Sequence, residues 1–328
     1  MDESFKLDER RHQEIYKRIE RESFGETKPV EHPRVIITGG QPGSGKSKLL
    51  EQAREQFADG NVVLINGDDL RNFHPRTEEI LKQDDKRFAE RTDPDSREWT
   101  RKLFARAIET RRNIVFESTM REAGPISKTM ERLRSEGYHL TAKVVATPER
   151  MSTTGIFRRY EEQKAEKGYG RWSELSSHDA GYEGMPRTVE HIEKHGLVDR
   201  LEVYNRAGDL LYDNEFKGDR WDKAPGAAQV IEQERQREPS HRERAEFQSD
   251  WRRIYDLMEQ RKAPVKELEL ARSTYEKLER ELSKLKTNMP KKGAQKPKNK
   301  GSSALRQKIE RLKESQKEQS REDDFLNP

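Results

Sequence analysis

The first residues that point to chemistry form a glycine-rich turn between a short β-branched run and a helical segment. The run Val35–Thr38 predicts a buried strand, and the pattern Gly-x4-Gly-Lys-Ser follows it over residues 40–47. In such a turn successive backbone N–H groups surround phosphate oxygens, and the following helix N-terminus adds positive potential. Lys46 can reach the β- and γ-phosphates, and the Ser47 hydroxyl can ligate Mg²⁺. The motif predicts a nucleoside triphosphate site formed by Gly40, Gln41, Pro42, Gly43, Ser44, Gly45, Lys46 and Ser47.

Two aspartates, Asp68 and Asp69, follow the next strand-like run, Val62–Ile65. Because α/β sheets bind ligands outside the carboxyl ends of their strands, these side chains are placed where an acceptor can bind. Phosphoryl transfer needs a carboxylate that orients the acceptor hydroxyl and takes its proton, and either aspartate can serve. The alternative is structural, since two acids at a helix start are typical of an N-cap and a first-turn charge.

Polar residues also follow a third run, Ile114–Phe116. Glu117 can hold Mg²⁺ directly or through water, and Thr119 can contact phosphate or substrate, although simple solvent exposure explains a strand-end glutamate equally well. The arginines at 158–159 and Arg171 can neutralise charge that spreads over a transferring phosphoryl group. A charged, solvent-facing helix surface is the alternative explanation for them.

These residues need a scaffold that brings strand ends together. From residue 34 to about residue 213, apolar runs alternate with segments long enough for crossover helices. Those segments are 46–57, 78–111 (one or two helices) and 126–136. The order predicts an α/β fold, with a P-loop kinase-like, mostly parallel sheet flanked by helices. Two final runs, Leu201–Tyr204 and Leu210–Tyr212, are separated by a turn and predict a hairpin.

Both ends of the chain are expected to be helical. Amphipathic spacing over 3–24 predicts a helix that packs on the core, within an N-terminal segment 1–30. The kinase-like domain is expected over 31–223, followed by a charged helical extension over 224–328. Apolar stripes in that extension predict two helices paired as an antiparallel hairpin. A Lys-rich linker over 286–303 and a last short helix over 304–320 complete the expected organisation.

Composition limits the class of protein. Of 328 residues, 30% are hydrophobic and 39% are charged, which indicates a modest core with long solvated segments. The net charge of +4 is small, so nucleic acid is an unlikely partner on this argument. Without cysteine there are no disulfides or cysteine-ligated metals. No run approaches the length of a membrane span and the N-terminus is charged, so a cytoplasmic protein without a membrane partner is expected.

Taken together, the motifs resemble one family. The turn at 39–47 is followed by Asp68-x-x-Arg71-x-x-His74-Pro75 and then by Phe116-Glu117-Ser118-Thr119. Farther along come Arg159-Tyr160-Glu161, Arg171 with His178-Asp179, and Arg200-Leu201-Glu202-Val203-Tyr204-Asn205-Arg206. From about residue 10 to about residue 213 the chain resembles the bacterial zeta toxins, the toxin half of plasmid and chromosomal toxin–antitoxin pairs.

The resemblance implies a kinase that moves the γ-phosphate of ATP to the 3′-hydroxyl of the sugar in UDP-N-acetylglucosamine, which blocks use of this cell-wall precursor. Asp68 matches the catalytic base, and Lys46 and Ser47 match the phosphate and metal contacts, with Mg²⁺ held by Ser47 and Glu117. A small helical antitoxin is the implied partner. Arg159 and Arg171 match the charge-stabilising arginines, and Glu117 and Thr119 match the substrate-side strand end. Arg71, His74 and Arg121 are also expected to bind substrate.

Two departures from the family pattern leave the acceptor open. Asn66 stands where an aspartate usually precedes the Gly-Asp pair, and Trp99-Thr100-Arg101-Lys102 occupies the helix where an acid facing the sugar is expected, with Glu98 as the nearest candidate. The acceptor is therefore UDP-N-acetylglucosamine, a related UDP-sugar, or another nucleotide hydroxyl such as a dinucleotide ribose. A different class also fits, namely an interaction module in which the P-loop acts as a nucleotide switch and the tail binds a partner.

Overall fold

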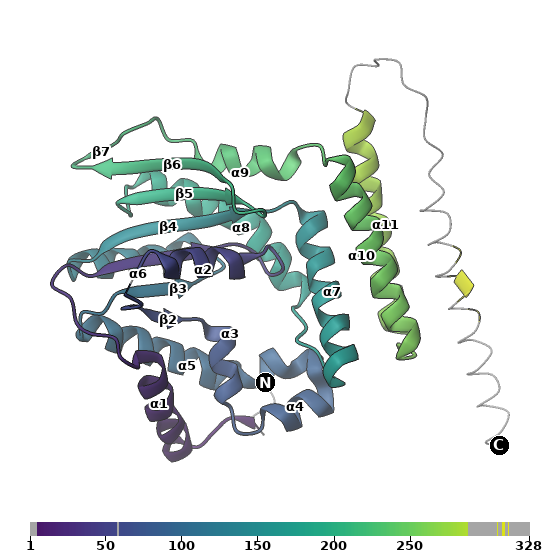
Figure 1. Cartoon of the computed structure of the whole chain (residues 1–328), viewed down its shortest axis with the longest axis horizontal. Coiled ribbons are helices and arrows are strands. Elements are labelled where there is room, and N and C mark those ends of the chain that lie inside the picture. The colour runs from purple at the N-terminus through teal and green to yellow at the C-terminus, as the bar shows by residue number, and fades with distance from the viewer. Residues whose placement is uncertain (1–4, 58, 288–306, 308–309, 312–313, 315–328) are drawn as a thin grey trace. The chain divides into compact units, whose positions relative to one another are not determined.

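The computed structural model describes residues 5–57 and 59–287, together with residues 307, 310, 311 and 314 (Figure 1). The chain divides into two compact units. Unit 1 consists of Met1–Ile156 and Arg171–Gln236, and unit 2 consists of Phe157–Gly170 and Arg237–Pro328. Helix α7 (Glu149–Lys167) begins in unit 1 and ends in unit 2. The domain boundary expected at residue 223 stays a prediction.

A seven-stranded sheet forms the centre of unit 1 in the described residues, in the order β2-β3-β1-β4-β5-β6-β7. The first five strands in that order are parallel, and β6 and β7 are antiparallel additions at one edge. This confirms the predicted mostly parallel sheet and its hairpin. The strands are β1 (Arg34–Gly39), β2 (Val63–Ile65), β3 (Ile114–Glu117), β4 (His139–Ala146), β5 (Arg200–Asn205), β6 (Leu210–Lys217) and β7 (Arg220–Trp221).

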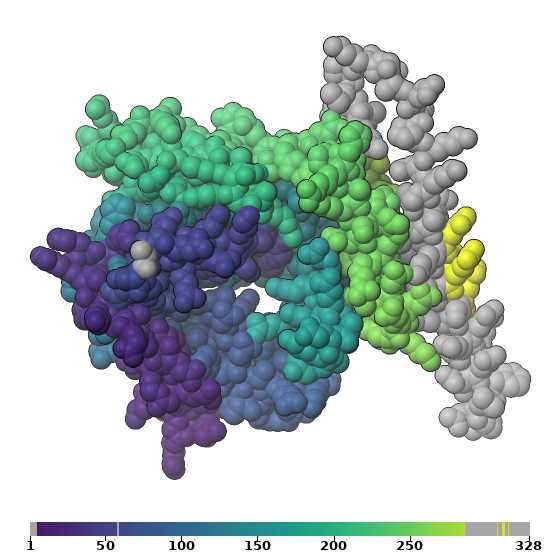
Figure 2. Space-filling view, viewed as in Figure 1, coloured from purple at the N-terminus to yellow at the C-terminus, as the bar shows by residue number. Residues whose placement is uncertain are grey.

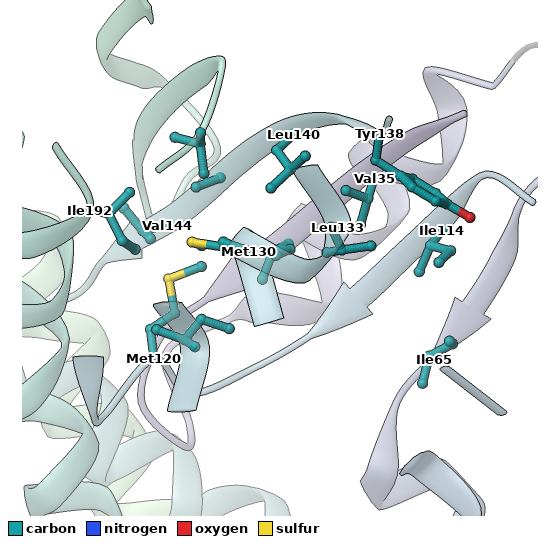
Figure 3. Close-up of a cluster of buried hydrophobic side chains, with 14 of the residues drawn as sticks. Val35, Ile65, Ile114, Met120, Met130, Leu133, Tyr138, Leu140, Val144 and Ile192 are labelled. Atoms are coloured by element: carbon teal, nitrogen blue, oxygen red, sulfur yellow. The ribbon is translucent and has the colours of Figure 1, made fainter. Parts of the chain in front are cut away.

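Helices cover both faces of the sheet, so alternate side chains of each central strand are buried on opposite sides. On one face, Ile36 of β1 and Val115 of β3 pack with Ala53 of α2 (Lys46–Glu55). On the other face the larger core lies under α6 (Ala123–Ser135), α8 (Leu175–Lys194) and α9 (Ala227–Gln236). Figure 3 shows Met130 and Leu133 of α6 beside the strand residues of this core.

The N-terminal helix α1 (Glu9–Phe24) packs on the core through Ile15, Tyr16 and Ile19. Its neighbour is α5 (Phe88–Glu109), and the two surfaces adjoin in the space-filling view (Figure 2). The segment predicted as one or two helices over 78–111 forms two. The elements between β2 and α5 are α3 (Gly67–Leu70), η2 (Arg71–Phe73), α4 (Thr77–Asp84) and η3 (Asp85–Arg87).

Unit 2 contains the predicted pair of tail helices, α10 (His241–Gln260) and α11 (Val265–Thr287). The second half of α7 joins them as a third helix. Phe157 of α7 lies 5.3 Å from Trp251 between ring centroids, and Glu161 accepts two hydrogen bonds of 2.7 Å from Arg261. The Lys-rich linker from residue 288 onward and most of the predicted last helix lie outside the described residues. Among the residues that are described, no helix has the length and hydrophobicity needed to cross a membrane.

Candidate active site

The predicted phosphate-binding loop joins β1 to α2. Gly43 and Gly45 have φ angles of 75° and 95°, a left-handed conformation that side chains with a Cβ rarely adopt. A Cβ on Gly43 would lie 2.1 Å from the carbonyl oxygen of Ser152, so only glycine fits there. The Lys46 ammonium donates to the carbonyl oxygens of Gly40 at 2.8 Å and Gln41 at 3.1 Å. These contacts keep the positive charge beside the loop.

The loop has the features that a phosphate group requires. Gly45 is the N-cap of α2 and supplies no side-chain hydrogen bond, so no capping side chain competes with an anion at the N-terminus of this ten-residue helix. The Ser44 hydroxyl is buried and has no hydrogen-bond partner among the described residues. Ser47, predicted to ligate Mg²⁺, is exposed in the first turn of α2. The residues present therefore fit a nucleotide phosphate.

The Asp68–Asp69 pair lies in α3, at the carboxyl end of β2. Asn66 is the N-cap of this helix: its side-chain oxygen accepts from the Asp68 N–H at 3.0 Å, and its amide nitrogen donates to Asp69 at 3.0 Å. Asn66 therefore caps α3 with its side chain. The Asp68 side chain is 71% exposed, so it is accessible to an acceptor. Desolvation raises the pKa of Asp69, and the charge of Arg171 opposes this shift.

Arg71 holds the Asp68 element against α5. Its guanidinium donates to Asp68 at 3.1 Å, to the carbonyl oxygen of Ala89 at 2.7 Å and to Asp93 at 3.0 Å. A planar guanidinium can bridge three acceptors in this way where a lysine ammonium on a flexible stem orients none of them. Arg71 was predicted to bind substrate. It lines the cleft described below, and it also positions Asp68.

Glu117 connects the phosphate-binding loop to the second half of the site. Its carboxylate lies 3.5 Å from the Lys46 ammonium, and its side chain is 19% exposed. Burial raises the pKa of Glu117; Lys46 partly offsets the shift, and the charges of Asp68 and Asp69 add to it. Glu117 offers carboxylate oxygens near the loop, as the predicted Mg²⁺ requires. The described residues contain no group of three or more His, Asp or Glu side chains arranged to hold a metal ion.

A cleft of about 690 Å³ opens at this end of the sheet. Asp68, Arg71, Glu117 and Thr119, all predicted from the sequence, lie on its walls. Phe104 and Phe116 line it as well, with ring centroids 5.0 Å apart. Helices α5 and α6 supply further polar walls: Asp93, Ser96, Arg97, Thr100, Arg101, Lys128, Thr129 and Arg132. Of these, the sequence had indicated only Thr100 and Arg101, in the helix expected to face the sugar.

His74 and Arg121, predicted to bind substrate, do not line this cleft. The His74 side chain is fully buried, and its ring hydrogen-bonds the carbonyl oxygen of Phe5 at 2.9 Å and the N–H of Arg76 at 3.2 Å. His74 therefore ties the N-terminal segment to the turn after α3. Arg121 is exposed and pairs with Glu122 at 3.2 Å. For both residues, direct substrate contact stays a prediction without geometric support.

The two predicted charge-stabilising arginines lie in different units. Arg171 belongs to unit 1, where it hydrogen-bonds Asn72 and lies 6.0 Å from the ring centroid of Phe88. It thereby adjoins the Asp68 element. Arg159 lies on the part of α7 that belongs to unit 2, so its role stays a prediction.

The burial of His74 predicts a pH-dependent stability. Burial lowers the pKa of His74, and the charge of Arg76 acts in the same direction, whereas the Phe5 carbonyl, Asp95 and Glu79 oppose it. As pH falls through the ordinary histidine range, the unfolded chain binds a proton that folded His74 does not, so the free energy of unfolding falls. Urea denaturation between pH 7.5 and 5.5 should give a steeper pH dependence for the wild type than for His74→Gln. An equal pH dependence of the free energy of unfolding in the two proteins would contradict a contribution from His74.

Comparison with known proteins decides the family. The zeta toxin family matches residues 17–217, which is more than half of the chain. The chain belongs to the zeta toxin family. Toxin zeta of Enterococcus hirae is 32% identical over 186 residues, which cover 56% of this chain and 65% of that protein. Toxin PezT of Streptococcus pneumoniae is 26% identical over 233 residues, which cover 71% of this chain and 89% of that protein.

A solved structure gives the same fold. A chain from the PezAT chromosomal toxin–antitoxin system of Streptococcus pneumoniae superposes with a TM-score of 0.66 at 24% identity, covering 78% of this zeta family chain and 99% of that one. The present chain spans just under two-thirds of the length of the Enterococcus hirae relative. The family match ends at residue 217, so α9 and the helices of the tail lie beyond it.

Proposed function

We propose that this zeta family protein is an ATP-dependent kinase that phosphorylates a hydroxyl of a sugar nucleotide. One observation carries the proposal: Lys46 of the phosphate-binding loop lies 3.5 Å from Glu117, and Glu117 lines the same cleft as Asp68. A donor loop and an acceptor cleft that meet at one ion pair suit transfer between two bound ligands. A nucleotide switch would need no such second cleft.

In the proposed reaction the acceptor oxygen attacks the γ-phosphorus of ATP, and the bond to the β–γ bridging oxygen breaks. Asp68 accepts the proton of the acceptor hydroxyl, while Arg71 orients the carboxylate from one side. Lys46 stays beside the phosphates and balances the charge that develops on them. Arg171, next to the Asp68 element, and Arg159 are proposed to add positive charge as the phosphoryl group moves.

ATP is proposed as the donor and Mg²⁺ as the metal, with Ser47 and Glu117 as the residues that would hold the ion. When bound, Mg²⁺ would neutralise phosphate charge and orient the phosphate oxygens. The buried hydroxyl of Ser44 and the uncapped N-terminus of α2 supply further polar contacts for phosphate. These features support a triphosphate donor.

The walls of the cleft favour an anionic acceptor. Arg97 and Arg101 are spaced i, i+4 on α5, and Lys128 and Arg132 have the same spacing on α6. On α5 these charges are already paired, Arg97 with Asp93 and Arg101 with Glu98, so Lys128 and Arg132 of α6 are the cations that a diphosphate is proposed to contact. Phe104 and Phe116 offer apolar surface to a base or sugar. We therefore propose UDP-N-acetylglucosamine or a related UDP-sugar as the acceptor, with the sugar 3′-hydroxyl as the phosphorylated group.

The stretch of α5 over residues 99–102, which departs from the family pattern, bears on the identity of the sugar. Glu98, the nearest acid in sequence, pairs with Arg101 at 2.6 Å and does not line the cleft. Thr100 does line it, and its hydroxyl donates to the carbonyl oxygen of Ser96 at 2.7 Å. Asp93 is the acid that α5 contributes to the cleft. Recognition of the sugar is proposed to rest on Asp93 and Thr100.

Turnover with a panel of UDP-sugars tests the proposal. The purified full chain, incubated with ATP and Mg²⁺, should form ADP and a phosphorylated UDP-N-acetylglucosamine that mass spectrometry identifies. UDP-glucose and UDP-N-acetylgalactosamine in parallel reactions would define the acceptor, and a dinucleotide would test the ribose alternative. Absence of a phosphorylated product from every acceptor would remove the kinase assignment.

We also propose a small helical antitoxin as partner, because the structurally similar S. pneumoniae chain comes from a toxin–antitoxin system. Expression in bacteria should then stop growth, and Lys46→Ala or Asp68→Asn should restore it. Growth unaffected by the wild-type protein, at an expression level equal to that of the two variants, would contradict a toxin.

A further inference from the structure

Gln41 belongs to the phosphate-binding loop, and its side chain is the centre of a buried polar layer beneath that loop. The Gln41 side chain is fully buried. Its amide nitrogen donates to the carbonyl oxygen of Thr147 at 2.9 Å and to the Ser152 hydroxyl at 3.2 Å, and its amide oxygen accepts from Arg235 at 3.4 Å. Both amide hydrogens and the oxygen are therefore used inside the protein. The side chain holds the loop, and only the backbone of Gln41 remains for a ligand.

Arg235 reaches this layer from α9, beyond the segment that matches the family. Its side chain is 1% exposed. One guanidinium nitrogen donates to the carbonyl oxygen of Tyr182 at 2.7 Å, the other contacts Gln41, and the guanidinium carbon lies 4.0 Å from the ring centroid of Tyr182. Glu232, at 3.5 Å, is the carboxylate paired with Arg235 and is half-exposed.

Burying the charge of Arg235 costs free energy, so the contacts that compensate for this cost show what the residue depends on. Desolvation lowers the pKa of Arg235, which reflects the unfavourable transfer of its charge from water. A buried guanidinium persists only where hydrogen bonds and aromatic contact compensate for lost hydration. That compensation comes from Tyr182, Glu232 and Gln41. The stability of this buried charge is thereby coupled to one conformation of the phosphate-binding loop.

The opposite side of Gln41 is fixed by a chain of polar side chains. The Ser152 hydroxyl lies 2.8 Å from Nε2 of His178, and Nδ1 of His178 lies 2.8 Å from Asp179. Ser152 and His178 are both fully buried, so this serine–histidine–aspartate arrangement has no route to a substrate. Its use is to orient the Ser152 hydroxyl toward Gln41.

We propose that Arg235 is a positioning residue for nucleotide binding, acting through Gln41 on the phosphate-binding loop. The inference rests on the proposed function, since it assigns a role in binding the triphosphate. It also makes α9 a required part of the nucleotide site, although α9 lies outside the matched segment.

Binding of a non-hydrolysable ATP analogue to full-length variants tests this role by calorimetry. Arg235→Met keeps the length of the side chain and removes its charge and hydrogen bonds; it should weaken binding about tenfold, as expected for loss of one charged hydrogen bond. Gln41→Met should weaken binding at least as much. The double variant should bind no more weakly than Gln41→Met alone, because Arg235 acts through Gln41. Gln233→Ala, an exposed change on the same helix, should bind like the wild type.

The alternatives give different outcomes. Unchanged affinity in folded Arg235→Met, or additive losses in the double variant, would overturn the inference while leaving the kinase proposal intact. Failure of the wild type itself to bind the analogue would reject the proposed function. Thermal unfolding without nucleotide identifies folded variants. If Arg235→Met does not fold, Arg235→Lys replaces it: an affinity equal to the wild type would overturn the inference, and weaker binding would support it. In steady state, Arg235→Met should raise KM for ATP and leave KM for the acceptor unchanged.

Discussion

Asp68→Asn should lower the rate of phosphoryl transfer by about a thousandfold and leave the affinity for a non-hydrolysable ATP analogue unchanged. A positioned general base contributes roughly 10²–10⁴-fold to a rate, and the amide that replaces the carboxylate cannot accept the proton. Asp68 lies in the acceptor cleft and is not in the phosphate-binding loop, so loss of its charge should affect kcat before it affects nucleotide binding. Product formation in single-turnover reactions, with analogue binding measured by calorimetry, checks both parts.

Asp69→Asn is the matched control for that experiment. Both aspartates lie in the first turn of α3, but Asp69 accepts a hydrogen bond from Asn66 and is not part of the cleft. We expect its removal to reduce transfer less than tenfold, an effect of about 1 kcal/mol, as for the loss of one capping interaction. A larger loss for Asp69→Asn than for Asp68→Asn would move the role of base to Asp69, whose pKa is raised by burial.

The features that sequence predicted well are local ones. The loop at 40–47 follows a buried strand and precedes a helix. The residue types of its motif are required by this local arrangement of strand, turn and helix, so they can be recognised from the sequence. The strand runs were recognisable for a similar reason, because a parallel sheet covered on both faces requires continuous apolar segments. Asp68, Glu117 and Thr119 could then be placed together, since they follow parallel strands at the same edge.

Features that depend on packing between distant segments could not be predicted. The basic walls of the cleft come from α5 and α6, where arginine and lysine at i, i+4 spacing look the same as any solvated helix face. His74 belongs to one of the motifs on which the resemblance to the family rests, yet its ring holds the N-terminal segment at Phe5. Arg235 lies in a stretch of glutamate, glutamine and arginine whose pattern gives no sign that one arginine is buried.

The packing of α7 against the tail helices could not be predicted for the same reason. The sequence offered Arg158 and Arg159 together as a basic site able to neutralise phosphoryl charge; in the structure Arg158 pairs with Asp250 of α10 at 3.2 Å. Glu161, two residues beyond Arg159, is buried and binds Arg261. Arg158 and Glu161 therefore join the second half of α7 to the tail helices of unit 2, while the role of Arg159 stays a prediction. Periodicity within the tail gave no information about α7 as a third helix.

Gly43→Ala should reduce affinity for the ATP analogue by at least about a hundredfold. The new Cβ would lie 2.1 Å from the carbonyl oxygen of Ser152 and 3.0 Å from a side-chain carbon of Ile156. Because the closest atom belongs to the backbone of α7, no change of rotamer relieves the contact, and the loop itself must move. Movement of the loop displaces the N–H groups that face phosphate and breaks the hydrogen bonds of Gln41. Calorimetry with the analogue, after confirmation of folding by circular dichroism, measures the loss.

Gly137→Ala separates this clash from the cost of the backbone conformation. Gly137 has a φ of 77°, close to the 75° of Gly43, and a Cβ there would meet nothing within 4 Å. A left-handed alanine costs roughly 1–2 kcal/mol at either position, so both variants should unfold at a lower temperature than the wild type. Only Gly43→Ala should also lose the nucleotide, because only its clash is transmitted to the loop. Equal affinities in the two variants would mean that the loop tolerates displacement, and the argument that its shape is fixed by α7 would be wrong.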